Sequence, residues 1–154
     1  MRERVASIED RAGTSRRDFV TCLSALSLVG LARPRAAEAN EEEDATTSAK
    51  AWLEVVDAGR YDESWDETAT AFRDALSREK WEQALVSVRR PLGNCLSRKL
   101  KDRKLVDSLP GAPKGPYVVI QFDTVFEGKD AAVETVTPAR GSDGRWLVAG
   151  YFIR

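Results

Sequence analysis

The spacing of apolar residues changes once along the chain, from a helical repeat to the alternation of strands. Between about residues 45 and 58, apolar positions recur three and four residues apart, which places them on one face of a helix. The residues of this face are Ala49, Trp52, Val55 and Val56. Gly59 follows them and supplies the stop that helices favour at their C-terminus. The pattern therefore predicts a first helix over residues 45–58.

Two more helices are predicted before the spacing changes. Asp62 and Ser77 are suitable N-caps, because short polar side chains accept hydrogen bonds from the free N–H groups of a first turn. Pro91 and Gly93 are expected to end the later helix. The apolar residues of these two helices are Trp65, Ala69, Phe72, Trp81, Leu85 and Val88.

The second half of the chain is typical of strands. Residues 117–126, YVVIQFDTVF, are almost all β-branched or aromatic, whereas residues 95–106 form a weaker strand candidate rich in lysine and arginine. Residues 108–116 have the composition of a loop. Turns at residues 128–129 and 142–144 introduce two further strands, AAVETVTP and RWLVAGYFIR. Helices followed by an antiparallel meander of about four strands predict an α+β fold.

The N-terminus has the three parts of a secretory signal. Several arginines precede the apolar residues 19–32, a run shorter than the roughly 20 residues of a membrane-spanning helix. Residues 37–39, Ala-Glu-Ala, form a small-residue cleavage site, so we expect cleavage between Ala39 and Asn40. The predicted organisation is a signal peptide over residues 1–39, a flexible acidic lead-in over 40–48 and one domain over 49–154.

Residues 15–20, SRRDFV, resemble the twin-arginine export motif. They depart from it by valine for leucine at Val20, and the next residue, Thr21, replaces a lysine. The resemblance implies a bacterial protein that is exported folded, meets the membrane only during export and is periplasmic or secreted. An uncleaved membrane anchor is the alternative.

The composition restricts the chemistry that the domain can perform. The 154 residues include 24 Lys and Arg, 25 Asp and Glu, and no histidine. Serine–histidine and cysteine–histidine nucleophile pairs and histidine-ligated metals are therefore excluded. No spacing indicates a cofactor or a metal, and the charge balance does not favour nucleic acid. Cys95 is expected to be a small buried residue. The basic residues within 98–104 are either a solvated edge that blocks aggregation or an anion-binding patch.

The expected strand register gathers a candidate site. A two-residue turn at residues 128–129 places Asp123 opposite Glu134, and the next hairpin places Glu134 opposite Tyr151, with Gln121 on the same face. In one interpretation this face lines a cavity, where Glu134 is a general base and Tyr151 a hydrogen-bond donor to an oxyanion. In the other, the acidic residues lie on the solvated face and an arginine pairs with Glu134.

The segment RRPLG supplies the arginines for that pairing. Arg89 and Arg90 are either a guanidinium pair for an anionic ligand or cations that suit the end of a helix. One of them is a candidate partner for Glu134.

The order of the elements resembles the nuclear transport factor 2-like, or cystatin-like, fold, in which a curved sheet wraps a first helix. The chain also resembles the bacterial family called domain of unknown function 4019, over residues 49–154. The matching segments are Ala51-Trp52-Leu53, Ser64-Trp65, Arg89-Arg90-Pro91-Leu92-Gly93, Leu109-Pro110-Gly111, Tyr117-Val118-Val119, Glu134-Thr135-Val136 and Gly150-Tyr151. The family implies no established activity.

Three functions are compatible with these observations. The first is a non-catalytic module of the cell envelope that binds a small ligand or a protein, and that could be a homodimer. The second is an enzyme of the isomerase or dehydratase type that uses Glu134 and Tyr151. The third is a structural or stress-related accessory protein. A carboxylate in a pocket favours the enzyme, and an apolar cavity without one favours the binding module.

Overall fold

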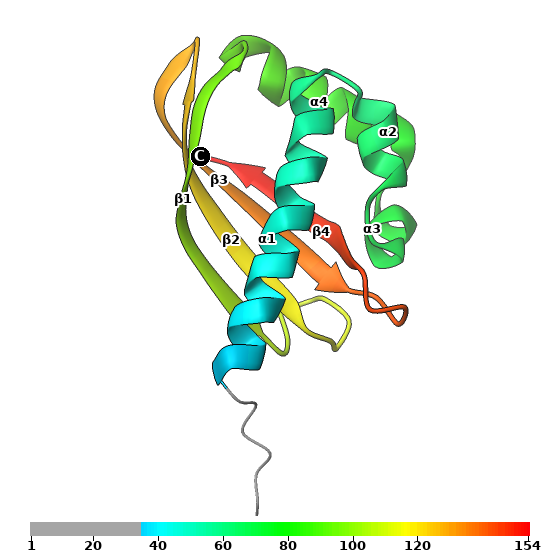
Figure 1. Cartoon of the computed structure of the whole chain (residues 1–154). Coiled ribbons are helices and arrows are strands. Elements are labelled where there is room, and N and C mark those ends of the chain that lie inside the picture. Colours follow the sequence, from blue (N-terminus) through cyan, green and yellow to red (C-terminus); the bar gives the residue numbers. More distant parts are fainter. Residues whose placement is uncertain (1–34) are drawn as a thin grey trace, which may run out of the picture. The chain divides into compact units, whose positions relative to one another are not determined.

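The computed structural model describes residues 35–154, in which four helices lie on one side of a four-stranded sheet (Figure 1). The predicted signal peptide falls mostly on residues 1–34, outside the described part of the chain. In that described part, no helix is both long and apolar enough to cross a membrane. Helices followed by an antiparallel sheet confirm the α+β class.

The first helix, α1 (Arg35–Asp57), begins ten residues before the predicted helix and ends one residue before its predicted end. Its buried face includes Ala49, Trp52 and Leu53, which pack against the sheet. The flexible lead-in predicted over residues 40–48 is wrong, because this segment is helical and Ala45 and Thr46 are buried.

Acidic residues of this segment are held by cations of the sheet. Arg103 contacts Glu43, and its Nε lies 3.8 Å from Glu42. The backbone N–H of Leu105 donates to Glu42 at 3.0 Å, and Arg140 donates to Glu41 at 3.0 Å. These partners are distant in sequence, so a local reading of the polar residues could not foresee the ordered helix.

The second predicted helix is divided into α2 (Tyr61–Asp66) and α3 (Thr70–Ala75). The division lies at Thr68, which forms a parallel bridge with Val148 and leaves the helical conformation. The last helix, α4 (Arg78–Leu92), begins as predicted at Ser77, whose side chain accepts from the backbone of Lys80. The helix continues through Pro91 and ends at Gly93, where φ is 70°.

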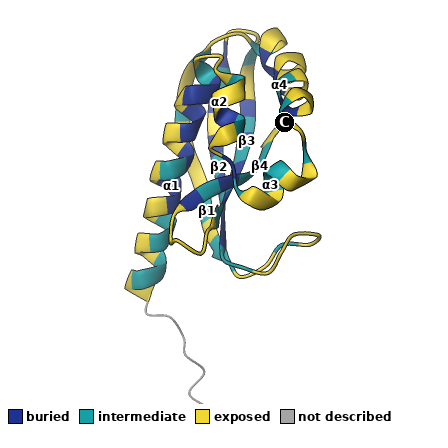
Figure 2. Cartoon of the chain, turned by 90° about the vertical axis from the view of Figure 1, so that its right-hand side faces the viewer, coloured by how far each residue is buried: buried dark blue, intermediate teal, exposed yellow. Residues whose placement is uncertain are grey.

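The sheet is an antiparallel meander in the order β1 (Cys95–Val106), β2 (Tyr117–Phe126), β3 (Lys129–Arg140) and β4 (Trp146–Ile153). The buried apolar residues lie between this sheet and the helices (Figure 2). Trp52 and Trp81 are part of this core, with ring centroids 6.0 Å apart. Their indole N–H groups both donate to Ser64, one to its carbonyl at 2.8 Å and one to its hydroxyl at 3.0 Å.

The register of β2 against β3 differs by one residue from the predicted register. Phe126 pairs with Lys129, and an irregularity between Thr124 and Phe126 shifts the remaining pairs. Asp123 therefore lies opposite Val133, and Glu134 lies opposite Phe122. A one-residue slip sends a side chain to the other face of a sheet, so Asp123 and Glu134 point in opposite directions.

The register of β3 against β4 differs from the prediction by two residues. Glu134 pairs with Ile153 and Tyr151 pairs with Val136, with a bulge between Val136 and Pro138. Because side chains alternate with a period of two, this shift keeps Glu134 and Tyr151 on the same face.

Candidate functional site

Glu134 is a carboxylate enclosed by the fold, with no exposed side-chain surface. Its Oε1 accepts from the Tyr151 hydroxyl at 2.5 Å and from Arg89 Nη1 at 3.3 Å. Its Oε2 accepts from Arg98 Nε at 2.6 Å and from the Thr124 hydroxyl at 2.7 Å. A buried carboxylate is tolerated only with such partners.

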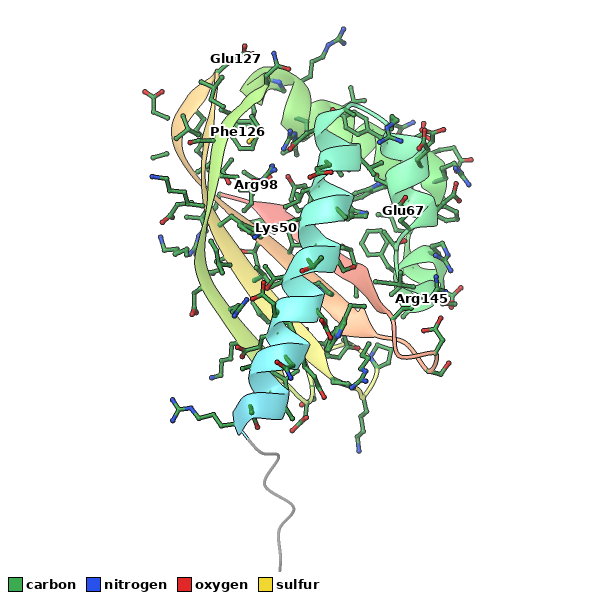
Figure 3. All side chains as sticks on the ribbon, in the orientation of Figure 1. Lys50, Glu67, Arg98, Phe126, Glu127 and Arg145 are labelled. Carbon is green, nitrogen blue, oxygen red and sulfur yellow. The ribbon has the colours of Figure 1, made fainter. Side chains whose placement is uncertain are left out.

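The two arginines join Glu134 to the end of α1. Arg89, on α4, is 4% exposed and donates to Asp57 Oδ1 at 2.5 Å. Arg98 extends from β1 toward α1 (Figure 3) and donates from Nη1 to Asp57 Oδ2 at 2.7 Å. The guanidinium of Arg89 also lies over the Phe126 ring, 4.7 Å from its centroid.

We call these residues the buried ion cluster. Each comes from a different helix or strand, so the cluster ties together six elements of the fold. The two carboxylates and two guanidinium groups balance in formal charge. The members are Asp57, Arg89, Arg98, Thr124, Glu134 and Tyr151.

The environment fixes the protonation of the donors. Burial, followed by the charge of Glu134, raises the pKa of the Tyr151 phenol, which therefore stays protonated. Burial alone would lower the pKa of Arg98, but its hydrogen bonds to Asp57 and Glu134 outweigh this and raise it. Burial also raises the pKa of the Cys95 thiol, which keeps the thiol neutral.

The cluster has the geometry of a structural ion-pair network rather than of a general base. A carboxylate has about four lone-pair positions, and Glu134 uses them for four donors. No acceptor position remains for a substrate proton. Within residues 35–154, no group of three histidine, cysteine, aspartate or glutamate side chains is placed to hold a metal ion.

Three of the predicted site residues lie elsewhere. Asp123 is on the outer face of the sheet, 57% exposed, and pairs with Lys101 at 2.7 Å. Gln121, on that same outer face, lies opposite Thr135. Arg90 is exposed on α4, so only Arg89 of the arginine pair reaches Glu134.

Sequence reasoning missed Asp57, Arg98 and Thr124 as members of the cluster. Thr124 could have been found by alternation, because it is two residues from the inward-facing Phe122. Arg98 lies directly opposite Thr124 and faces the helices, so it is not part of a solvated basic edge. Its location follows only once the β1–β2 register is known.

A cleft lies beside α3, where the outward-facing Thr137 and Ala139 of β3 form part of its wall. Its volume is about 300 Å³. Small side chains from α3 and the outer face of the strands leave this space open, and Tyr117 fixes the neighbouring loop by donating to the Pro113 carbonyl at 2.7 Å. We call it the α3 cleft, and its walls are Ala69, Ala71, Phe72, Ala75, Leu109, Gly111, Ala112, Pro113, Tyr117, Thr137, Ala139, Ala149 and Gly150.

Comparison with known proteins identifies a fold and a family. A solved structure from Catenulispora acidiphila aligns with a TM-score of 0.52 and 14% sequence identity, over 77% of this chain and 94% of that one. This similarity concerns the fold alone. No curated protein matches the chain. The family model described as "Protein of unknown function (DUF4019)" matches residues 48–151, and the chain therefore belongs to the DUF4019 family.

Proposed function

We propose that this chain is an exported, non-catalytic binding module that holds a small apolar ligand in the α3 cleft. The observation that carries the proposal is the lining of the cleft. Among residues 35–154, the walls are alanine, glycine and other aliphatic or aromatic side chains together with Thr137, and none of them carries a charge. Small-molecule sites are typically concave and mostly apolar, with volumes from about 300 Å³ upward.

The hydrogen bonds that Glu134 already accepts favour a binding protein over an enzyme that uses Glu134 and Tyr151. Both carboxylate oxygens are already filled by donors, and the phenol of Tyr151 donates to Glu134 rather than facing a cavity. None of the described wall residues of the α3 cleft belongs to the buried ion cluster. The cleft also favours a ligand-binding protein over an accessory protein whose role is purely structural.

Export is the second part of the proposal, and the signal-like pattern of residues 1–39 supports it. Cleavage after Ala39 is compatible with the fold, because every buried residue of α1 lies at Ala45 or later. We further propose that the sheet and α1 form a cone of the nuclear transport factor 2-like type. N-terminal sequencing of the protein from the host's envelope fraction tests export, which predicts a chain beginning near Asn40.

Fluorescence of N-phenyl-1-naphthylamine, a neutral apolar probe that brightens when it leaves water, tests the cleft. We expect the full-length chain to bind the probe. Ala71, an exposed wall residue on α3, offers a way to fill the cleft. Ala71→Trp should weaken probe binding by about tenfold or more, because the indole would occupy the ligand's space.

The matched control is Ala84→Trp, which adds the same side chain at an exposed alanine of α4 outside the cleft. This variant should bind the probe as the unchanged chain does. Equal probe binding by the Ala71→Trp and Ala84→Trp variants would show that the probe binds elsewhere, and the proposed ligand site would then be wrong.

A further inference from the structure

We infer that the ligand of the α3 cleft is an anionic amphiphile: a single apolar chain that ends in a carboxylate or a similar anion. The inference rests on the proposed function and adds the chemical class of the ligand. It comes from a second hollow beside the cleft, which differs from the cleft in its charge.

The second hollow, which we call the basic hollow, adjoins the α3 cleft. Its volume is about 370 Å³. Five residues line both spaces, so the two spaces lie side by side. The shared walls are Ala69, Ala71, Pro113, Tyr117 and Ala139.

Cations line the basic hollow on several sides. They come from α3, from the loop before β2 and from the two sides of the β3–β4 hairpin, where Figure 3 labels Arg145. One acidic side chain, Asp143, accompanies them. The cations are Arg73, Lys114, Arg140 and Arg145.

Two of these charges are neutralised and two are not. Arg145 pairs with Asp143 at 2.7 Å, and Arg140 pairs with Glu41 at 3.0 Å. The guanidinium of Arg73 instead donates to the carbonyls of Asp66 and Thr68, which carry no net charge. Lys114 is exposed and has no carboxylate partner within residues 35–154. The hollow therefore keeps an excess of positive charge that an anion would offset.

A molecule that fills both adjoining spaces must therefore be apolar at one end and anionic at the other. The α3 cleft excludes charge, because burying an ion among alanine and aromatic side chains costs free energy without compensation. The basic hollow attracts an anion through its excess of positive charge. A linear molecule with an apolar body and an anionic head satisfies both ends, whereas a cationic amphiphile satisfies only one.

Displacement of N-phenyl-1-naphthylamine from the full-length chain tests the inference. Three competitors share a ten-carbon chain and differ at the head: decanoate, decanol and decyltrimethylammonium, each used below its micelle concentration. We expect decanoate to displace the probe at about one fifth of the decanol concentration or less at low salt, since exposed charge pairs contribute up to about 1 kcal/mol each. The decyltrimethylammonium ion should be the weakest competitor. High salt should reduce the preference for decanoate.

Two double variants that remove the same charge test whether the anionic head of the ligand binds in the basic hollow. Lys114→Gln combined with Arg145→Gln removes two cations from the hollow, and both side chains are exposed, so the fold should not change. This double variant should lose most of the preference for decanoate over decanol. Lys50→Gln combined with Lys80→Gln removes the same charge from exposed sites outside the hollow and should retain the preference.

The outcomes separate the inference from the proposed function. If decanol and decanoate displace the probe equally, the anionic head is wrong and the apolar ligand site stands. If both double variants lose the preference equally, the effect is one of net charge and the assigned head position is wrong. If neither competitor acts and Ala71→Trp has no effect, the proposed function itself fails. Binding to anionic phosphatidylglycerol vesicles without binding of monomeric decanoate would also overturn the inference.

Discussion

The strand residues of the buried ion cluster and of the α3 cleft point to opposite faces of the same sheet, and the two regions differ in almost every respect. The cluster gathers two carboxylates and two guanidinium groups, which fill one another's hydrogen-bonding positions instead of facing a ligand. The cleft has a volume of about 300 Å³ and no charged wall among the described residues. The comparison teaches that chemically capable side chains indicate a ligand site only where the fold also leaves space beside them.

The largest expected effect comes from removing the charge at the centre of the cluster. Glu134→Gln should lower the free energy of unfolding by about 3 kcal/mol or more, because it leaves two buried guanidinium groups with one carboxylate. Urea unfolding followed by tryptophan fluorescence measures the change. Asp123→Asn is the matched control, since Asp123 is an exposed acid whose pairing with Lys101 should contribute less than about 1 kcal/mol. Equal effects of the two substitutions would show that the cluster is not the more stabilising region.

The second effect depends on pH and separates Tyr151 from the rest of the cluster. Its pKa is raised by folding above the ordinary value of 10.0, so its contribution to stability is complete below that pH. As the pH rises above 10, the unfolded chain releases the proton and the folded chain keeps it. The free energy of unfolding should therefore fall by about 1.4 kcal/mol per pH unit from this group.

Tyr151→Phe removes this dependence while it retains the ring. Urea unfolding between pH 9 and pH 11.5 should show a shallower alkaline decline for the variant than for the unchanged chain. Parallel declines would mean that burial and the charge of Glu134 do not raise the pKa of this phenol.

The smallest expected effect is the difference in unfolding free energy between two threonine substitutions, one on each face of the sheet. Thr124→Val removes the hydroxyl that donates to Glu134 at 2.7 Å and should cost about 1–2 kcal/mol of unfolding free energy. Thr137→Val changes a wall of the α3 cleft and should alter stability by less than about 0.5 kcal/mol. Thermal unfolding of both variants under one set of conditions checks the difference. A larger loss for Thr137→Val would reverse the assignment of the two faces.

Much of the fold could be predicted from residues near one another in sequence. The repeats of apolar residues predicted three helical regions, and β-branched and aromatic residues predicted β2. The early start of α1 could not be predicted, because its acidic side chains find their cations on distant strands. The split between α2 and α3 likewise depends on Val148, far along the chain.

The candidate site was partly predicted because errors in register have unequal consequences. The β3–β4 pairing at Glu134 differs from the predicted pairing by two residues, one from the turn and one from the bulge between Val136 and Pro138, so Glu134 and Tyr151 stayed together. An irregularity after Thr124 moved the β2–β3 pairing by one, so Asp123 left the site. Pro138 was a usable signal, because proline inside a sheet is confined to edges and bulges. No residue of comparable meaning in the sequence signals the irregularity after Thr124.

The bridge between Thr68 and Val148 also bears on how the molecule avoids aggregation. The N–H of Ala69 donates to the Val148 carbonyl at 2.8 Å. Part of the exposed backbone of the edge strand β4 is therefore already hydrogen-bonded and cannot pair with a strand of another chain there. The opposite edge strand, β1, is rich in lysine and arginine, so two protein molecules that paired along it would repel each other. Growth by strand addition is therefore opposed at both edges of the sheet. At β4 the backbone is partly hydrogen-bonded already, and at β1 like charges repel.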